Sequence, residues 1–325
     1  MQRQPSKETS TIEQSINQAP ARRTRIRSGV LAACCAVAMA LTGCIADSGP
    51  RTGASPNPTP TVAAGGPTVS ASNAPLETTP ASNRVPVYWI GRSDGKAYLY
   101  REFRESSGQE NPVTIALRTM MSQKPLDPDY FTPWQEPESL ATSVSGKNVI
   151  TVDVSKGAFN SNLDADMAQR AVQQLVYTAS AAAASSGLID SGQQIQVVIL
   201  VDGHTGFEAF GHVQLGEPMA RDVSLVAPVW IIDPQEGVSL PAGAVKINGR
   251  SVAPSVPVRW QILREDGNGE KNVFLNGQAL PSTEAGQGGA FSFTVGLASG
   301  KYVLRMGMLE GESERESDTR TFSVR

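Results

Sequence analysis

The spacing of apolar and polar residues predicts an α/β region that begins near residue 85. Residues 87–90 form a continuous apolar run and residues 97–103 alternate apolar and polar positions, and both patterns are typical of strands. Residues 113–121 place apolar side chains on one face of a helix. Asn111 followed by Pro112 gives that helix a favourable first turn.

The same region continues with a hairpin, a second helix and another strand. Residues 144–154 predict the hairpin, with its turn at Ser145-Gly146. Asp164 caps the longest helical pattern, and Gly187 ends it. Residues 195–201 are almost wholly apolar, which predicts a central strand. We therefore expect residues 85–225 to form an α/β (α+β) sandwich domain, with helices packed on a mixed sheet.

From residue 226 to residue 325 the helical period disappears and seven short strand-like runs take over. These runs are residues 229–232, 244–247, 256–263, 273–275, 291–295, 302–308 and 319–324. About a hundred residues with seven such runs suit an all-β immunoglobulin-like sandwich. Trp260 is expected in the core between its sheets, although no cysteine pair is present to pack against it.

A signal peptide is expected at residues 1–43. Arginines at positions 22–27 precede an apolar stretch of about a dozen residues, whereas a spanning helix needs roughly 20. The following Leu41-Thr42-Gly43-Cys44 resembles the lipobox of bacterial lipoproteins. This resemblance implies that Cys44 becomes the first residue of the mature protein and carries lipid, with palmitate among its acyl chains. An ordinary secretory signal and a twin-arginine signal at Arg22-Arg23 are the alternatives.

Residues 44–84 are rich in Pro, Ser, Thr and Ala and contain no aromatic residue. Such a composition cannot build a core, so a disordered tether is expected here. A tether in this position would hold the folded body away from the membrane.

Composition excludes several classes of function. All three cysteines lie at or before Cys44, which removes cysteine nucleophiles, iron–sulfur clusters and cysteine-bound zinc from the mature protein. From Cys44 onward 22 basic residues face 29 acidic ones, a net charge of −7. An acidic body does not suit nucleic acid or anionic headgroups as partners.

An ordered set of motifs resembles two domain families. The chain resembles the GerMN domains of sporulation and germination lipoproteins in five motifs, which are VPVYWI at 85, KPLDPDY at 124, VITVDVS at 149, AVQQLVY at 171 and VDG at 201. It also resembles the immunoglobulin-like domain associated with bacterial spore germination, in the motifs PVWI at 228, PQEG at 234, VRW at 258, GKY at 300 and DTRTFSV at 318. The resemblance implies binding or assembly modules without an established active site.

One loop is the candidate binding surface. Asp127, Asp129, Tyr130 and Trp134 combine carboxylates with aromatic rings, a combination that can stack on a sugar and bind its hydroxyls. The alternative is that Phe131 and Trp134 fold inward while Asp127 and Asp129 form turns around Pro128.

Two other polar segments are weaker candidates. Asp202, His204 and His212 could form a metal or proton-transfer site, but their spacing matches no ligand motif, and structural or solvent-exposed roles are favoured. The acidic run from residue 310 to Asp318 is expected to be a solvated hairpin tip without function.

These observations predict a non-catalytic lipoprotein that is anchored through acylated Cys44 at the outer face of the cytoplasmic membrane. We expect no catalytic residue, no metal and no cofactor. Its partners would be the lipid bilayer and a cell-wall glycan or an envelope protein. A hydrolase that processes cell-wall glycan is the alternative, and a pair of carboxylates facing a cleft would favour it.

Overall fold

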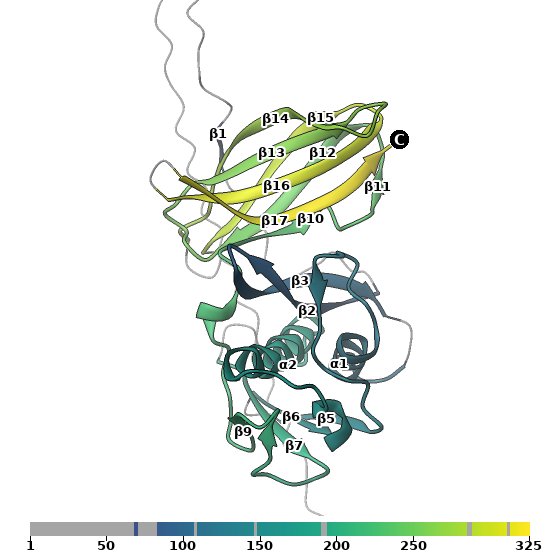
Figure 1. The fold of residues 1–325 in the computed structure, drawn as a ribbon, viewed down its shortest axis with the longest axis vertical. Coiled ribbons are helices and arrows are strands. Elements are labelled where there is room, and N and C mark those ends of the chain that lie inside the picture. Colours follow the sequence, from purple (N-terminus) through teal and green to yellow (C-terminus); the bar gives the residue numbers. More distant parts are fainter. Residues whose placement is uncertain are drawn as a thin grey trace, which may run out of the picture. The chain divides into compact units, whose positions relative to one another are not determined.

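The computed structural model describes residues 68–70, 83–106, 109–145, 148–189, 194–284, 288–310 and 313–325 (Figure 1). The expected signal peptide and Cys44 lie outside these ranges, as does the expected tether apart from residues 68–70, 83 and 84. Among helices in the described ranges, none has the length and apolarity needed to cross a membrane.

The α/β region contains two three-stranded sheets. The antiparallel sheet has the order β3-β2-β4 and the mixed sheet has the order β5-β6-β7. Their strands are β2 (Arg84–Ser93), β3 (Lys96–Glu105), β4 (Tyr130–Phe131), β5 (Leu140–Val144), β6 (Val149–Val154) and β7 (Gln196–Val201). The helices α1 (Pro112–Ser122) and α2 (Ala165–Ser185) lie between the sheets, where both contact β2 (Figure 1). The expected mixed sheet with packed helices is thus present.

Short elements complete this region. They are the 3₁₀ turns η1 (Lys156–Phe159) and η2 (Val223–Leu225) and the two-residue strands β8 (Glu208–Ala209) and β9 (Val213–Gln214). The last of these turns, η2, leads into the sandwich.

Local sequence signals explain where both helices begin. The Asn111 side chain accepts a hydrogen bond from the Val113 N–H, and Pro112 occupies the first turn, as predicted. The Asp164 carboxylate accepts from the Met167 N–H in the same way. After α2, Gly187 has a φ of +71°, a conformation that glycine adopts without steric cost.

The prediction that residues 195–201 form a central strand is wrong. β6 is the central strand of its sheet and β7 lies at the edge. Val197 on β7 exchanges two backbone hydrogen bonds of 2.8 Å with Met219, so a loop covers this edge. A covered edge strand can be as apolar as a central one, because its backbone groups are paired and shielded from water.

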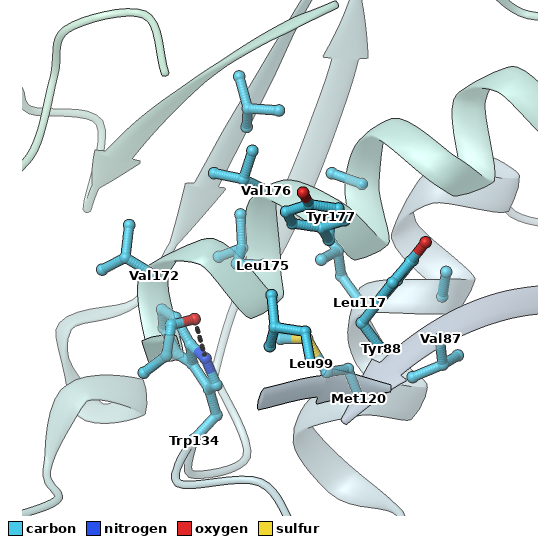
Figure 2. Close-up of a cluster of buried hydrophobic side chains, with 14 of the residues drawn as sticks. Val87, Tyr88, Leu99, Leu117, Met120, Trp134, Val172, Leu175, Val176 and Tyr177 are labelled. Atoms are coloured by element: carbon cyan, nitrogen blue, oxygen red, sulfur yellow. Dashed lines mark hydrogen bonds between the residues drawn. The ribbon is translucent and has the colours of Figure 1, made fainter. Parts of the chain in front are cut away.

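The helix α2 also completes the open edge of β2. Beyond the short β4, the Tyr88 N–H donates to Thr178 Oγ1 at 3.0 Å, and Gln174 Nε2 donates to the Tyr88 carbonyl at 2.9 Å. Gln174 and Thr178 are four residues apart and therefore share one helix face. Around them a buried apolar cluster that includes Leu99 and Leu175 fills the space between helix and sheet (Figure 2).

The C-terminal region is a β-sandwich of two sheets. One has the order β10-β12-β15, and the other includes the run β14-β13-β16-β17-β11, with β1 pairing on β14. The strands are β1 (Thr68–Ser70), β10 (Val229–Asp233), β11 (Ser239–Leu240), β12 (Gly243–Ser251), β13 (Val258–Glu265), β14 (Lys271–Leu280), β15 (Ala290–Leu297), β16 (Gly300–Glu310) and β17 (Ser313–Val324).

All seven strand-like runs are strands, and their order matches the two sheets of an immunoglobulin-type sandwich. The sequence did not reveal β11, which pairs in parallel with the last strand, β17. Trp260 from β13 stacks on Phe293 from β15 with ring centroids 4.7 Å apart, so it lies in the inter-sheet core as predicted. The core of the sandwich therefore contains this aromatic pair and no disulfide, since residues 226–325 include no cysteine.

Candidate functional site

The candidate surface of Asp127, Asp129, Tyr130 and Trp134 is mostly buried. Asp127, Tyr130 and Trp134 are only 3%, 7% and 3% exposed, and Asp129 alone is exposed to solvent. The interpretation of these four residues as an open binding surface is therefore wrong. The alternative, that Trp134 folds inward, is confirmed. Its hydrogen bond and its aromatic neighbours explain why.

Trp134 belongs to the core of the α/β region. Its indole Nε1–H donates to the Ala171 carbonyl of α2 at 2.9 Å (Figure 2). Its ring meets Phe159 and Phe210 with centroid distances of 4.9 and 5.2 Å. This hydrogen bond and the two ring contacts hold the side chain of Trp134 inward.

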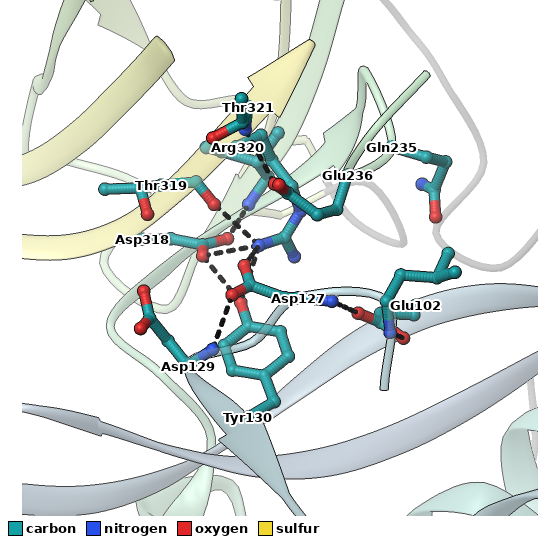
Figure 3. Close-up of polar contacts among 12 residues, drawn as sticks. Glu102, Asp127, Asp129, Tyr130, Gln235, Glu236, Asp318, Thr319, Arg320 and Thr321 are labelled. Carbon is teal, nitrogen blue, oxygen red and sulfur yellow. Dashed lines mark hydrogen bonds and ion pairs between the residues drawn. The ribbon is translucent and has the colours of Figure 1, made fainter. Parts of the chain in front are cut away.

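Asp127 and Tyr130 instead meet two residues from the last strand of the sandwich. Arg320 Nη1 contacts Asp127 Oδ2 at 2.6 Å, Asp318 Oδ1 at 2.9 Å and Tyr130 Oη at 2.8 Å (Figure 3). The Tyr130 hydroxyl also donates to Asp318 Oδ1 at 2.6 Å. We call Asp127, Tyr130, Asp318 and Arg320 the arginine joint, because these residues tie the segment 127–130 of the α/β region to β17 of the sandwich.

The geometry of β17 places the two charged residues of the sandwich side by side. Asp318 and Arg320 are two positions apart and therefore point to the same face of the strand. A β-bulge precedes them, since the pairing passes from Met306–Asp318 to Gly307–Glu316 and leaves out Ser317. The second carboxylate oxygen of Asp318 accepts the Ile231 N–H of β10 at 2.7 Å, which fixes its orientation.

The α/β side of the joint is held by Glu102 on β3. Its two carboxylate oxygens accept the backbone N–H groups of Asp127 at 2.8 Å and Leu126 at 2.9 Å. Asp127 in turn accepts a hydrogen bond from the Asp129 N–H at 2.9 Å. This bond closes the turn around Pro128 that was the alternative interpretation of the sequence. The tyrosine ring of the joint, Tyr130, stacks on Tyr100 at 4.7 Å.

In the arginine joint two carboxylates share one guanidinium. Burial and the neighbouring charges together shift the pKa values of Asp127, Asp318 and Arg320. Burial raises the pKa of Asp318 to about 6, although Arg320 opposes this change. Burial likewise raises the pKa of Asp127 above its usual value, again against the attraction of Arg320. Burial would lower the pKa of Arg320, but Asp318, Tyr130 and Asp127 more than offset it, so that pKa is raised.

The carboxylates of the joint are buried and held by hydrogen bonds. The side chains of Asp318 and Asp127 are 1% and 3% exposed, and all four of their carboxylate oxygens accept hydrogen bonds from the protein. The same two residues border a pocket of about 290 Å³.

The histidine loop does not assemble a metal site. His204 Nδ1 lies 2.6 Å from the Asp202 carbonyl, whereas His212 Nε2 lies 2.9 Å from the Leu163 carbonyl. Each ring therefore contacts a separate backbone group. In the described ranges, no group of three or more His, Cys, Asp or Glu residues is placed to hold a metal ion.

Sequence reasoning missed the half of the joint that the last strand contributes. The run ending at Asp318 was expected to be solvated, but Asp318 is 5% exposed and Arg320 only 1%. The expectation for Asp318 is therefore wrong, because Asp318 lies on the same buried face of β17 as Arg320. One sequence signal could have indicated the buried pair. Asp318 and Arg320 form an Asp-x-Arg motif, which places two charges on one face of a strand whose remaining residues on that face are apolar.

Comparison with known proteins identifies the α/β region. The family model described as "Germane: Sporulation and spore germination" matches residues 86–206. The chain contains a GerMN domain. This match agrees with the resemblance of its motifs. None of the curated proteins matches the chain significantly.

Solved structures with similarity to this GerMN protein are distant. The first GerMN domain of the sporulation protein GerM from Bacillus subtilis is 16% identical, with a TM-score of 0.32, and the match covers 43% of this chain and 95% of that one. The tandem GerMN domains of GerM are 15% identical with a TM-score of 0.33, and the match covers 62% of each chain.

The first prediction concerns Arg320. Replacing it with methionine keeps the length of the side chain but leaves two buried carboxylates without a cation. We expect Arg320→Met to lower the free energy of unfolding by about 3–5 kcal/mol in denaturant titrations. Lys301→Met is the matched control, because it breaks the exposed ion pair with Glu265 on the same sheet and should cost less than about 1 kcal/mol. Equal losses in the two variants would contradict the buried joint.

The second prediction concerns pH. Because the pKa of Asp318 is about 6 in the folded protein and 3.8 in the reference state, the folded chain retains a proton that the unfolded chain has lost between about pH 4 and 6. Stability from this group is therefore present at low pH and lost as pH rises through that window. At about 1.4 kcal/mol per pKa unit, the unfolding free energy of wild type relative to Asp318→Asn should fall by about 2 kcal/mol from pH 4 to 7. A relative stability that rises with pH would refute this assignment.

Proposed function

We propose that this GerMN protein is a membrane-anchored lipoprotein that acts as a non-catalytic binding or assembly module at the cell envelope. Its folded body would lie at the outer face of the cytoplasmic membrane, joined to lipid on Cys44 by residues 44–84, within which residues 68–70 form β1 and pair with β14. The proposal is supported by the lipobox-like motif and by the GerMN family match. Its partner would be a cell-wall glycan or an envelope protein.

The observation that carries this proposal is the arginine joint. It links the GerMN domain to the sandwich through groups that are almost inaccessible to water. Further contacts act in the same place. The Ala227 N–H donates to the Leu99 carbonyl at 3.1 Å, and Trp230 of β10 packs into the apolar core of the α/β region. A surface that spans both domains is therefore ordered before any partner arrives, which reduces the entropy lost on binding.

The third prediction tests the anchor. We expect Cys44→Ser to move the protein from the membrane fraction to the soluble extracytoplasmic fraction, because the thiol that carries the lipid is gone. Cys34→Ser is the control, since it removes a cysteine inside the expected signal and should leave the protein on the membrane. Membrane association of Cys44→Ser, together with an unmodified wild-type N-terminal peptide by mass spectrometry, would overturn the anchoring proposal.

The fourth prediction tests the absence of catalysis. Wild-type protein incubated with purified peptidoglycan should release no soluble glycan fragments, because both carboxylates of the joint are buried and paired with Arg320. Sedimentation of the protein with the insoluble material would indicate a glycan partner, and its absence would indicate a protein partner. Release of fragments that disappears in a folded Asp318→Asn variant would instead establish the hydrolase alternative.

A further inference from the structure

One strand of the sandwich has an edge that is only partly paired. β12 pairs with β15 along residues 243–250, but β10, on its other side, pairs only with residues 248–251. After Asp233 the chain leaves this sheet and forms β11, which pairs with β17 of the other sheet. No strand in the described ranges therefore lies beside residues 243–247 of β12 on this side.

The alternation of hydrogen bonds along β12 shows which backbone groups face the open edge. The Ser251 N–H donates to the Gly289 carbonyl next to β15 at 2.8 Å. In an antiparallel ladder, residues two positions apart point to the same neighbouring strand. Because the register between β12 and β15 has no break, the N–H and C=O groups of Ala244 and Lys246 point away from β15. Among the described residues, these four groups have no hydrogen-bond partner.

A groove of about 360 Å³ lies along this open edge. β12 contributes Ala244, Val245 and Lys246 to its lining. The segment around β11 contributes apolar side chains, namely Val238, Leu240 and Pro241. The groove thus combines unpaired backbone groups with an apolar surface. An extended peptide satisfies both when it adds to the edge of a sheet, because its backbone pairs with the edge while alternate side chains pack beside it.

The charge at the groove favours an acidic partner. Lys246 is exposed and takes part in none of the ion pairs between described residues. Asp233, which also lines the groove, already accepts a hydrogen bond from Asn248 Nδ2 at 3.0 Å. Ala244 and Lys246 place their side chains on the exposed face of β12. A carboxylate on the solvent side of a bound strand would therefore lie across from the ammonium group of Lys246.

We propose that this groove binds an extended peptide segment of a protein partner, which pairs with β12 as an added strand. Small apolar side chains of the segment face Val238 and Leu240, and an acidic side chain faces Lys246. A second copy of this chain fits less well, because its matching edge carries the same positive Lys246. The inference deepens the proposed binding role, on which it rests, by naming a peptide segment as the ligand.

The fifth prediction tests the open edge by amide hydrogen exchange of the full chain in a non-ionic detergent, measured by NMR. The amides of Ala244 and Lys246 should exchange at least about a hundredfold faster than those of Val245 and Ile247, which face β15. Equal protection of all four amides would show that another segment of the chain covers the edge. Protection that grows with protein concentration would show that a second copy covers it. Either result would overturn the proposal.

Binding is tested with the peptide acetyl-TVEVT-amide. Added peptide should protect the amides of Ala244 and Lys246 in a saturable way, with a dissociation constant below about 1 mM. The control peptide carries N-methyl groups on its first valine and on its glutamate, so that one of them blocks pairing in either strand direction. It should bind at least about tenfold more weakly.

Lack of saturable protection, or equal binding of the methylated peptide, would contradict the groove. Neither failure affects the membrane association that Cys44→Ser tests, so the groove and the proposed anchored role can fail separately.

A charge exchange locates the peptide beside Lys246. Wild type should bind acetyl-TVKVT-amide about two- to fivefold more weakly than acetyl-TVEVT-amide, and Lys246→Glu should reverse this preference. The matched control is Lys271→Glu, which makes the same change at an exposed position of β14 in the other sheet and should keep the preference of wild type. An unchanged preference in folded Lys246→Glu protein would contradict the assignment.

Discussion

Moving a guanidinium out of water costs several kcal/mol unless anions and hydrogen bonds replace its lost hydration. The Nη1 group of Arg320 obtains these contacts from Asp318 on its own strand and from Asp127 and Tyr130, nearly two hundred residues earlier. Neither domain alone supplies all of these groups. Separating the domains would leave Asp127 without its cation and Arg320 with only one of its two carboxylates. The joint therefore acts less by adding net stability than by penalising every other arrangement of the two domains.

The function that we propose depends on this constraint. A pocket of about 360 Å³ is lined by residues of both the GerMN domain, such as Tyr88, and the sandwich, such as Trp230, so its shape is defined only while the domains keep their places. Both acids of the joint contact Arg320, which ties the two domains together.

Patterns of local sequence predicted most of the fold. Asn111 and Asp164 marked the helix starts, and the spacing of apolar residues marked all seven strands of the main sandwich pattern, because caps and periodicity act within a few residues. The edge position of β7 was missed, since the Met219 segment that covers it lies far along the chain. In the candidate site, Asp127 and Tyr130 were singled out for the wrong reason. Their partner Arg320 is nearly two hundred residues away, and no local pattern shows that such distant residues meet.

The central claim, that the arginine joint fixes the GerMN domain and the sandwich as one body, is tested most directly by backbone residual dipolar couplings of the full chain in solution. Couplings from the strands and helices of each domain report its orientation independently of its internal structure. The account predicts that one alignment tensor fits the amides of both domains together. Two tensors of clearly different magnitude or orientation would show that the domains move independently and would contradict it.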